Sequence, residues 1–274
     1  MERIKPPKEI PADLINSYTM NGKMKLEYCY IDESYHSEHP LVYEKKAVDL
    51  LMERIQCKEK FYYRRTDSLL YKALERFKID GKEVAIMGSI TPLYESFCLV
   101  YGGKPTTIEY NRIISHDSRL RVMTVDEYDR NPLKFDAAFS ISSFEHDGLG
   151  RYGDTLNPDG DLDAMKKMET VLKPKGLFFV SVPVGNDTLV WNACRVYGKF
   201  RLPKLLQGWK LLHIFTSKVF FDLQPIFILE NSDSDGRDCN AVFRNMLIKS
   251  LITKTISVAL ATTNQLGKRT RPVQ

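Results

Sequence analysis

The chain has 274 residues, of which 43% are hydrophobic and 27% are charged, and its mean hydropathy is −0.31. These values are typical of a globular protein that buries one large core, with or without an extension. The formal net charge is only +5, and the one clear basic cluster lies in the tail at residues 268–271. Nucleic-acid-binding proteins usually concentrate basic residues on one face, so we expect no nucleic-acid partner.

Cysteine spacing and hydropathy bear on metal binding and on the cellular location of the protein. The five cysteines are widely spaced, and none forms a CxxC pair or a His/Cys cluster with zinc spacing. We predict no metal site and a reduced, packed thiol at Cys98. The N-terminal segment contains three prolines and lacks the apolar core of a signal peptide, and no apolar run reaches the ~18 residues of a membrane span. We expect a cytoplasmic protein without a membrane span.

The first part of the chain is predicted to be partly helical. Residues 1–40 are polar and weakly periodic, and apolar spacing then predicts a helix from Val42 to Gln56 and another over residues 69–77. Both helices would cap a sheet. Three regions are expected: a polar segment with a capping helix at 1–59, the main domain at 60–230 and a C-terminal extension at 231–274.

From residue 83 onward, short apolar runs alternate with helical spacing. Helices are predicted after Thr91-Pro92 and over residues 161–172. Two-sided apolar strands that alternate with helices predict a doubly wound, three-layer α/β/α fold with five parallel strands. Two further runs near the end are too close together for a crossover helix, so we expect an antiparallel edge pair. The strand predictions are 84–87, 106–109, 120–125, 135–141, 177–182, 211–215 and 225–229.

The end of the first predicted strand is a candidate cofactor site, because ligands of doubly wound sheets bind at the carboxyl ends of the strands. Gly88 and Ser89 end this strand, and Glu109 ends the next one, about 20 residues later, where a carboxylate is suited to hold a ribose diol. The alternative for Glu109 is an ordinary solvent-facing strand end. The loop lacks GxGxxG, which counts against NAD and FAD because a pyrophosphate needs close backbone approach. S-adenosylmethionine has a ribose and no phosphate.

The stretch SSFEHDGLGRYGDTLNPDGD, residues 142–161, follows the fourth predicted strand. Counted from Asn157, its sixth and twelfth positions lack the glycine and glutamate of a calcium loop. His146 titrates near neutrality and is the candidate catalytic base, with Glu145 or Asp147 orienting it. Ser142, at the start of the stretch, is a candidate cofactor contact.

Two further residues of this stretch are candidate acceptor contacts. Arg151 would clamp an anionic group, and Tyr152 would stack on a planar group or a sugar. In the structural alternative, glycines turn the loop, Asp159 or Asp161 caps the next helix, and His146 only makes hydrogen bonds. A connection of this length is uncommon inside a compact domain unless it is functional or disordered, and its aromatic and arginine content argues against disorder.

A second polar and aromatic cluster follows the fifth predicted strand. It contains Arg195 and Tyr197, which are candidate acceptor contacts at the same edge of the sheet. The alternative is loop packing with solvated arginines. The other members of the cluster are Asn192, Gly198 and Arg201.

Three segments resemble the nematode family called domain of unknown function 268, which is similar to class I S-adenosylmethionine-dependent methyltransferases. They are VAIMGSITPLYESFCLVYGGKPTTIEYN from Val84, the stretch 142–161, and ETVLKPKGLFFVSVPVG at 169–185. The resemblance covers roughly residues 60–230 and implies a seven-stranded methyltransferase-like sheet. It also implies that Gly88 backs the methionine part of the cofactor, Glu109 holds the ribose, and Asp126 approaches the adenine amino group. For Asp126 a helix cap is the alternative.

These observations lead to one functional expectation and two competing ones. We expect an S-adenosylmethionine-dependent methyltransferase that acts on a small-molecule or glycan-like acceptor. A non-catalytic methyltransferase-like binding or scaffold protein is the alternative, and the glycine-poor first loop favours it. An NAD-dependent Rossmann enzyme is disfavoured because the phosphate loop is missing. The sequence does not specify the acceptor or the oligomeric state.

Overall fold

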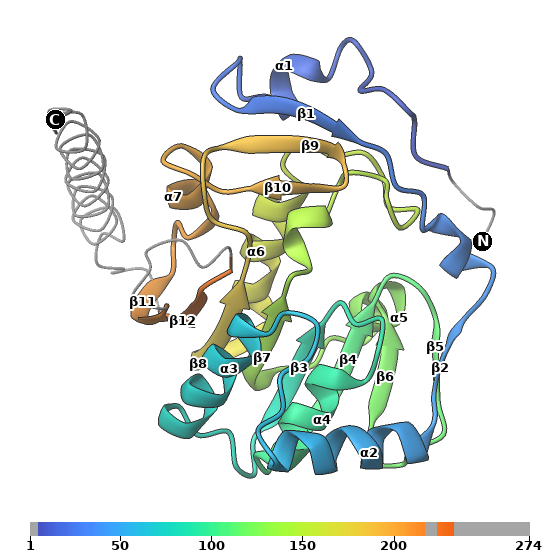
Figure 1. Ribbon diagram of the computed structural model, residues 1–274, viewed down its shortest axis with the longest axis vertical. Coiled ribbons are helices and arrows are strands. Elements are labelled where there is room, and N and C mark those ends of the chain that lie inside the picture. The colour runs from blue at the N-terminus through green and yellow to red at the C-terminus, as the bar shows by residue number, and fades with distance from the viewer. Residues whose placement is uncertain (1–4, 217–223, 233–274) are drawn as a thin grey trace, which may run out of the picture.

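The computed structural model describes residues 5–216 and 224–232. Most of the predicted C-terminal extension, with Cys239 and the basic cluster at 268–271, lies outside these residues. Within them, the chain forms a seven-stranded sheet with helices on both faces and two smaller sheets (Figure 1). No helix of this described part is long and apolar enough to cross a membrane.

The large sheet confirms the predicted architecture. Its strands are β3 (Glu83–Met87), β4 (Lys104–Glu109), β6 (Arg121–Thr124), β7 (Phe135–Ile141), β8 (Leu172–Ser181), β11 (Lys210–Phe215) and β12 (Ile226–Glu230). They lie in the order β11-β12-β8-β7-β3-β4-β6. The five strands from β8 to β6 run parallel, and β12 is antiparallel to both β8 and β11. This is the doubly wound α/β sheet with an antiparallel edge pair.

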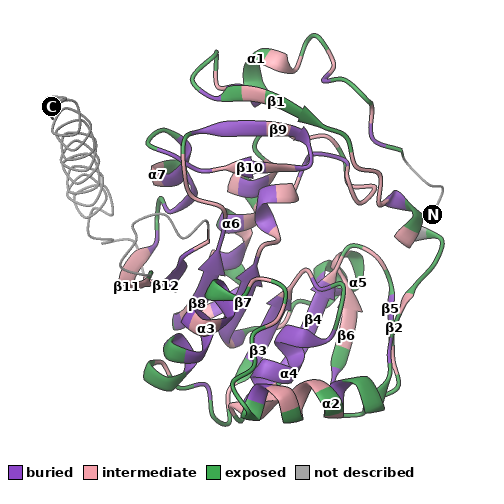
Figure 2. Ribbon diagram, in the orientation of Figure 1, coloured by how far each residue is buried: buried purple, intermediate pink, exposed green. Residues whose placement is uncertain are grey.

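Helices cover both faces of this sheet, which explains why its strands are apolar on both sides. The helices are α1 (Ile15–Tyr18), α2 (Lys45–Gln56), α3 (Arg65–Arg76), α4 (Leu93–Val100), α5 (Val125–Arg130), α6 (Gly160–Val171) and α7 (Arg201–Leu205), with 3₁₀ turns η1 (Ser34–Ser37) and η2 (Phe144–His146). One core cluster packs α5, α6 and α7 against one face, and another packs α2, α3 and α4 against the opposite face. Figure 2 shows β3, β7 and β8 as buried between them. The boundary expected between residues 59 and 60 therefore separates two helices, α2 and α3, that pack into the same core.

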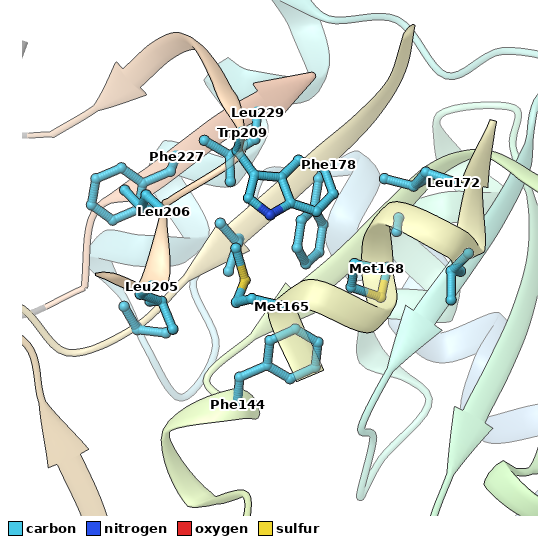
Figure 3. Packing of buried hydrophobic residues seen from close by; sticks show 14 of the residues in the cluster. Phe144, Met165, Met168, Leu172, Phe178, Leu205, Leu206, Trp209, Phe227 and Leu229 are labelled. Carbon is cyan, nitrogen blue, oxygen red and sulfur yellow. The ribbon is translucent and has the colours of Figure 1, made fainter. Parts of the chain in front are cut away.

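One of these clusters fixes the start of the loop that follows β7. Phe144, the first residue of η2, is buried beside Met165 of α6 (Figure 3). Its ring centroid lies 6.0 Å from that of Phe178 on β8, which in turn lies 5.3 Å from the ring of Trp209. Because a buried aromatic side chain has few alternative positions in a close-packed core, this packing also fixes the two polar residues that follow Phe144.

The two smaller sheets bring the N-terminal segment onto the main domain. β1 (Lys25–Cys29) runs parallel to β9 (Thr188–Asn192), which is antiparallel to β10 (Cys194–Val196). In Figure 1 this three-stranded sheet lies over the carboxyl ends of the parallel strands. Leu189 and Trp191 of β9 are buried in one cluster with Tyr18 of α1. The second small sheet pairs β2 (Leu41–Tyr43) with β5 (Ile113–Ser115).

Some elements differ from the sequence predictions. The helix predicted from Val42 begins at Lys45, because Leu41–Tyr43 pairs with Ile113–Ser115 instead. β1, β9 and β10 were not predicted either. These strands are short, and β1 pairs with β9 from a distant part of the sequence, so local periodicity carries little signal for them.

Candidate functional site

A cavity of about 1030 Å³ lies at the carboxyl ends of the parallel strands. Gly88, Glu109, Ser142 and Pro183, which lie at or after the ends of β3, β4, β7 and β8, line it. β3 and β7 are neighbours in the sheet, and the chain proceeds outward in opposite directions from them, to β4 and to β8. Ligands of doubly wound sheets bind at such a reversal of strand order. The cavity is therefore the candidate site.

The first loop after β3 requires the glycine at position 88. Gly88 has a φ of +71°, a left-handed conformation that favours glycine. A Cβ atom there would lie 2.2 Å from the Oγ atom of Ser143, so any side chain would collide with the loop after β7. The absence of a side chain at position 88 thus lets the carboxyl ends of β3 and β7 approach each other.

Glu109 holds this loop from the next strand. Its Oε2 atom accepts a hydrogen bond from the Ser89 amide at 3.0 Å, and its Oε1 atom accepts one from the Tyr110 amide at 2.8 Å. Burial raises the pKa of this carboxyl above its ordinary value, and the backbone hydrogen bonds oppose the shift. A carboxylate has about four lone-pair positions, so Glu109 keeps acceptor capacity for a ligand.

A second carboxyl group supports the loop from below. Glu95 of α4 is fully buried, and its Oε1 atom accepts a hydrogen bond from the Thr107 hydroxyl at 2.6 Å. Its Oε2 atom accepts one from the Ser89 hydroxyl at 3.1 Å. Ser89, a predicted cofactor contact, thus lines the cavity with its hydroxyl already bonded inside the protein.

The same loop is poorly suited to a phosphate group, which binds to free amides at a helix N-terminus. The Ser89 amide donates to Glu109, and the Leu93 amide at the start of α4 donates to the Thr91 carbonyl at 2.7 Å. Pro92 lies between these residues and has no N–H group. The structure thus agrees with the sequence argument against a pyrophosphate-containing cofactor.

The end of β7 carries a polar cluster. Ser142, with a φ of +55°, has an uncommon left-handed backbone for a residue with a side chain. Its hydroxyl donates to Glu145 Oε1 at 2.5 Å and accepts from Gln224 Nε2 at 2.9 Å. Glu145 is fully buried, and burial raises its pKa from 4.5 to about 7. Strained backbone of this kind is often found at functional sites.

His146 lies next to this carboxyl group with a fixed ring orientation. Its Nδ1 atom lies 2.6 Å from the carbonyl oxygen of Ala193. Because a carbonyl only accepts, Nδ1 carries the hydrogen and Nε2 is the free acceptor, 3.8 Å from Glu145 Oε1. Burial and the positive charge of Arg151 lower the pKa of His146 from 6.5 to about 4. The imidazole is neutral near pH 7, and the carboxyl group has the pKa closer to neutrality.

The cavity wall is rich in acids that lack a cationic partner. Glu109, Glu145, Asp147 and Asp154 line it, and among the described residues none of the four pairs with a lysine or arginine. Burial, and next the charge of Asp154, raises the pKa of Asp147 well above its ordinary value. Raised carboxyl pKa values mean that this wall favours bound positive charge.

The cations of the wall are already neutralised. Arg151 lines the cavity, but its Nε atom donates to Glu33 Oε2 at 2.6 Å, and its NH1 atom donates to the Ala193 carbonyl at 3.2 Å. Lys167 pairs with Asp129 at 2.7 Å. The predicted anion clamp by Arg151 does not fit this arrangement, because its charge is compensated from the N-terminal segment. Tyr152 lines the cavity beside it, 5.8 Å from the His146 ring.

Arg195 and Tyr197, which we expected to contact the acceptor, are buried behind the cavity and do not line it. Arg195 donates to the carbonyl of Asp147 at 2.7 Å, and the Tyr197 hydroxyl donates to Asp161 Oδ2 at 2.8 Å. Arg201 also pairs with Asp161, at 2.5 Å. These residues support the loop from inside, and the burial of both arginines contradicts the alternative of solvated arginines. The acceptor contacts of Arg195 and Tyr197 stay predictions that this placement does not support.

Asp161 and Asp126 also differ from their expected roles. Asp159 or Asp161 was the expected cap of α6. Asp159 is at the N-cap position without a side-chain hydrogen bond to the helix, and the carboxylate of Asp161 is fully buried among the arginines. Asp126 is exposed in the first turn of α5 and is not among the residues that line the cavity, whereas Val125 is. The cap of α5 is Thr124, which contradicts the helix-cap alternative for Asp126. The adenine contact of Asp126 stays a prediction that its exposed position does not support.

Several lining residues were not predicted from the sequence. Tyr110 directly follows Glu109 and is 52% exposed, and Tyr63 and Tyr94 lie near Glu145. Tyr110 could have been predicted as a lining residue, because it directly follows Glu109. The role of Glu33 could not have been predicted in this way, because its partner Arg151 is distant in the sequence. In the described part of the chain no group of three or more His, Cys, Asp or Glu side chains is placed to hold a metal ion.

Solved structures similar to this chain include three with low sequence identity. The 1,6-didemethyltoxoflavin-N1-methyltransferase of Burkholderia thailandensis, solved with S-adenosylhomocysteine, is 16% identical over 69% of this chain and 89% of that chain, with a TM-score of 0.47. An O-methyltransferase family protein from the same organism is 7% identical over 75% and 64%, with a TM-score of 0.47. TehB from Haemophilus influenzae is 11% identical over 61% and 62%, with a TM-score of 0.39. No curated protein matches the chain.

The family comparison covers the candidate site directly. The sequence model of the DUF268 family matches residues 81–239, which include every predicted catalytic and cofactor residue and the whole stretch 142–161. The resemblance noted from the sequence is thereby confirmed. Because the match spans more than half of the 274 residues, the chain belongs to the DUF268 family, described as a Caenorhabditis protein of unknown function.

Proposed function

We propose that the protein is an S-adenosylmethionine-dependent methyltransferase that acts on a small-molecule acceptor. The observation that carries the proposal is the acid-lined cavity at the reversal of strand order, with Gly88 and Glu109 at adjacent strand ends. Its position suits a nucleoside ligand. Its charge suits a sulfonium, which is a cation, and opposes a pyrophosphate.

The residues present fit this cofactor. Glu109 would accept hydrogen bonds from the ribose hydroxyls with its remaining lone pairs, and Tyr110 would stack on the adenine ring. Gly88 lines the cavity at the end of β3, where the methionine part would lie against its backbone. The Ser89 hydroxyl faces Glu95 and Thr91, so its contribution is to hold the loop.

When bound, the cofactor supplies an electrophilic methyl group whose bond to sulfur breaks as the bond to the acceptor forms, leaving a thioether. The protein's own part is to align the acceptor and to remove its proton. Glu145 and His146 are placed for the proton, with His146 Nε2 free to accept and Glu145 Oε1 at 3.8 Å from it. Since burial brings the Glu145 pKa to about 7, this carboxyl is the stronger base of the pair at neutral pH.

The competing function is a binding protein that keeps the fold without turnover. Both functions would use the cofactor cavity, but only catalysis requires Glu145 and His146 to accept a proton. The position of a fixed neutral imidazole beside a carboxyl with a raised pKa favours catalysis, because such perturbed groups cluster at active sites.

Calorimetric titration of the purified chain tests this proposal. We expect S-adenosylmethionine and S-adenosylhomocysteine to bind, and NAD⁺ at the same concentration to give no heat of binding. Tight binding of NAD⁺ with no response to S-adenosylhomocysteine would overturn the proposal. Binding of both adenosyl ligands, together with no methylated product from any amine or alcohol acceptor, would favour the non-catalytic alternative.

A further inference from the structure

We propose that the acceptor presents a primary amine, bound as an ammonium by Glu145 in an inner pocket of the cavity. We define the inner pocket by its residues at the end of β7 and beside it: Tyr63, Tyr94, Ser142, Glu145, His146 and Gln224. This inference rests on the proposed function and deepens it, because it names the chemical class of the acceptor.

The first argument is a pair of buried polar atoms without a partner. Glu145 is 0% exposed, and its Oε2 atom has no hydrogen-bond partner among the described residues. The hydroxyl of Tyr94, a residue that is 8% exposed, also lacks one there. Leaving a buried carboxyl oxygen unpaired costs free energy that a ligand donor would recover. Both residues belong to the lining of the cavity, so movement of neighbouring side chains would open these atoms to a ligand.

The second argument is that the inner pocket offers mainly acceptors. His146 uses its Nδ1 hydrogen for Ala193, which leaves Nε2 as an acceptor. The Ser142 hydroxyl donates to Glu145 Oε1, and the Gln224 amide donates to Ser142. These three donors are used inside the protein. The positions left free include His146 Nε2 and Glu145 Oε2, which accept, and the Tyr94 hydroxyl, which can accept as well as donate. A group with several N–H donors, such as an ammonium, complements them.

The third argument is charge. Asp147 and Asp154 lie on the same cavity wall, and the cations Arg151 and Lys167 are paired with Glu33 and Asp129. Within the described part of the cavity wall, a carboxylate ligand would meet unpaired acids and no free cation, whereas an ammonium would form a charge-assisted hydrogen bond with Glu145. A hydroxyl group of a ligand could donate to Glu145, but it would not balance the negative charge of the cavity wall.

Tyrosine rings add a reason for a cation. Tyr63 and Tyr94 stand in the inner pocket, and Tyr62, Tyr110 and Tyr152 line the surrounding cavity. The face of an aromatic ring attracts a cation within about 6 Å. Rings together with unpaired carboxylates are the combination that binds amines.

The same contact provides the proton transfer that an amine needs. An ammonium has no lone pair and cannot attack a methyl group. Glu145 as carboxylate accepts one N–H proton, which leaves a neutral amine with a free lone pair and a protonated Glu145. After the methyl group is transferred, the product is a secondary ammonium, so charge and protons balance. Ser142, which donates to Oε1, holds the carboxyl in place during this step.

Three matched probes test the inference: benzylamine, benzyl alcohol and benzoate, which share a ring and differ in charge. They are titrated calorimetrically at neutral pH into the full chain saturated with S-adenosylhomocysteine. We expect benzylamine to bind at least about tenfold more tightly than the other two, as a hydrogen bond to a charged group implies. Equal binding of benzyl alcohol, or preferred binding of benzoate, would overturn the inference.

Two variants locate the contact. Glu145→Gln keeps the shape and removes the charge, and should weaken benzylamine at least about tenfold. Asp163→Asn is the control. Asp163 is an exposed acid of the cavity lining that accepts a hydrogen bond from Asn157, so its replacement removes one negative charge from the cavity without touching Glu145. Unchanged benzylamine affinity in Glu145→Gln, or an equal loss in Asp163→Asn, would contradict the inference.

Cofactor binding separates failure of the inference from failure of the proposed function. If S-adenosylhomocysteine binds the wild type and Glu145→Gln alike, the fold and the cofactor site of the variant are intact. Loss of benzylamine alone then supports Glu145 as the amine contact. If S-adenosylhomocysteine binds and benzylamine does not bind the wild type, the inference fails while the proposed function stands. If S-adenosylhomocysteine itself does not bind, the proposed function fails.

Discussion

The Nδ1 atom of His146 donates to the carbonyl oxygen of Ala193 at 2.6 Å, which leaves its Nε2 atom 3.8 Å from Glu145 Oε1. The hydrogen bond comes from the turn between β9 and β10, which lies 47 positions further along the chain. It fixes the tautomer of the imidazole without using a carboxylate. The acid beside the histidine is therefore available for a ligand.

The ionisation of His146 is the first testable consequence. Burial and the charge of Arg151 lower its pKa to about 4, so the ring should stay neutral, with the hydrogen on Nδ1, down to about pH 5. Nitrogen-15 NMR of labelled histidine measures both the tautomer and the titration. A midpoint near 6.5, or a hydrogen on Nε2, would contradict the assigned environment.

The raised pKa of Glu145 makes its replacement pH-dependent. The folded protein holds a proton on this carboxyl up to about pH 7, whereas the unfolded chain loses it near 4.5. The folded state thus binds more protons in this window, and the carboxyl costs stability as pH rises from 4.5 to 7. Glu145→Gln removes this cost, so its free energy of unfolding relative to the wild type should rise by about 3 kcal/mol across the window.

Urea unfolding of both proteins at several pH values measures this difference. Comparing the variant with the wild type cancels the contributions of other titrating groups, including Glu95, whose pKa burial also raises to about 7. A difference that does not change between acid and neutral pH would show that Glu145 ionises normally.

Asp161 should be important for stability. It is fully buried between Arg195 and Arg201; burial alone would raise its pKa, but the two guanidinium groups outweigh burial and lower it. Asp161→Asn leaves two buried arginines without their counter-charge and should cost roughly 3–5 kcal/mol. Asp159→Asn is the matched control, because this carboxylate is 64% exposed and lies 3.4 Å from Arg201. The control should cost under about 1 kcal/mol. Similar unfolding midpoints for the two variants would refute the structural role of Asp161.

Gly88→Ala should disturb the cofactor loop. The new Cβ atom would meet Ser143 Oγ at 2.2 Å in a left-handed backbone, so both strain and a collision arise. Gly22→Ala provides the control, since Gly22 has a φ of +78° and no atom within 4 Å of such a Cβ. The control should lose about 1 kcal/mol of stability from backbone strain alone. We expect only Gly88→Ala to lose S-adenosylhomocysteine binding as well, and equal affinity in the two variants would argue against this position of the cofactor.

The main fold could be predicted from the sequence because its strands are continuous apolar runs between helices. Phe135–Ile141 was placed with its observed bounds, and the antiparallel edge pair was recovered from the short connection before Ile226–Glu230. Strand β1 escaped prediction because it pairs with β9, about 160 residues away (Lys25 with Thr188, for example). Strands β9 and β10 pair with each other over a few residues, but they are too short to show a clear period.

The site could be predicted only in part. Gly88, Glu109, Glu145 and His146 follow strand ends, so the topology brings them together. The state of each group depends on contacts that local sequence does not encode. Burial reverses the expected base strengths of Glu145 and His146, and Glu33 from a distant segment pairs with Arg151.

The affinity of Glu109→Gln for S-adenosylhomocysteine, measured by calorimetry, tests the central claim most directly. Glu83→Gln is the control, since Glu83 begins β3 at the opposite end of the sheet and pairs with Lys104 on the surface. We predict that the wild type and the control bind alike, and that Glu109→Gln binds at least about tenfold more weakly, because a ribose hydroxyl loses a charged acceptor. Equal affinity in all three proteins would contradict the proposed cofactor site.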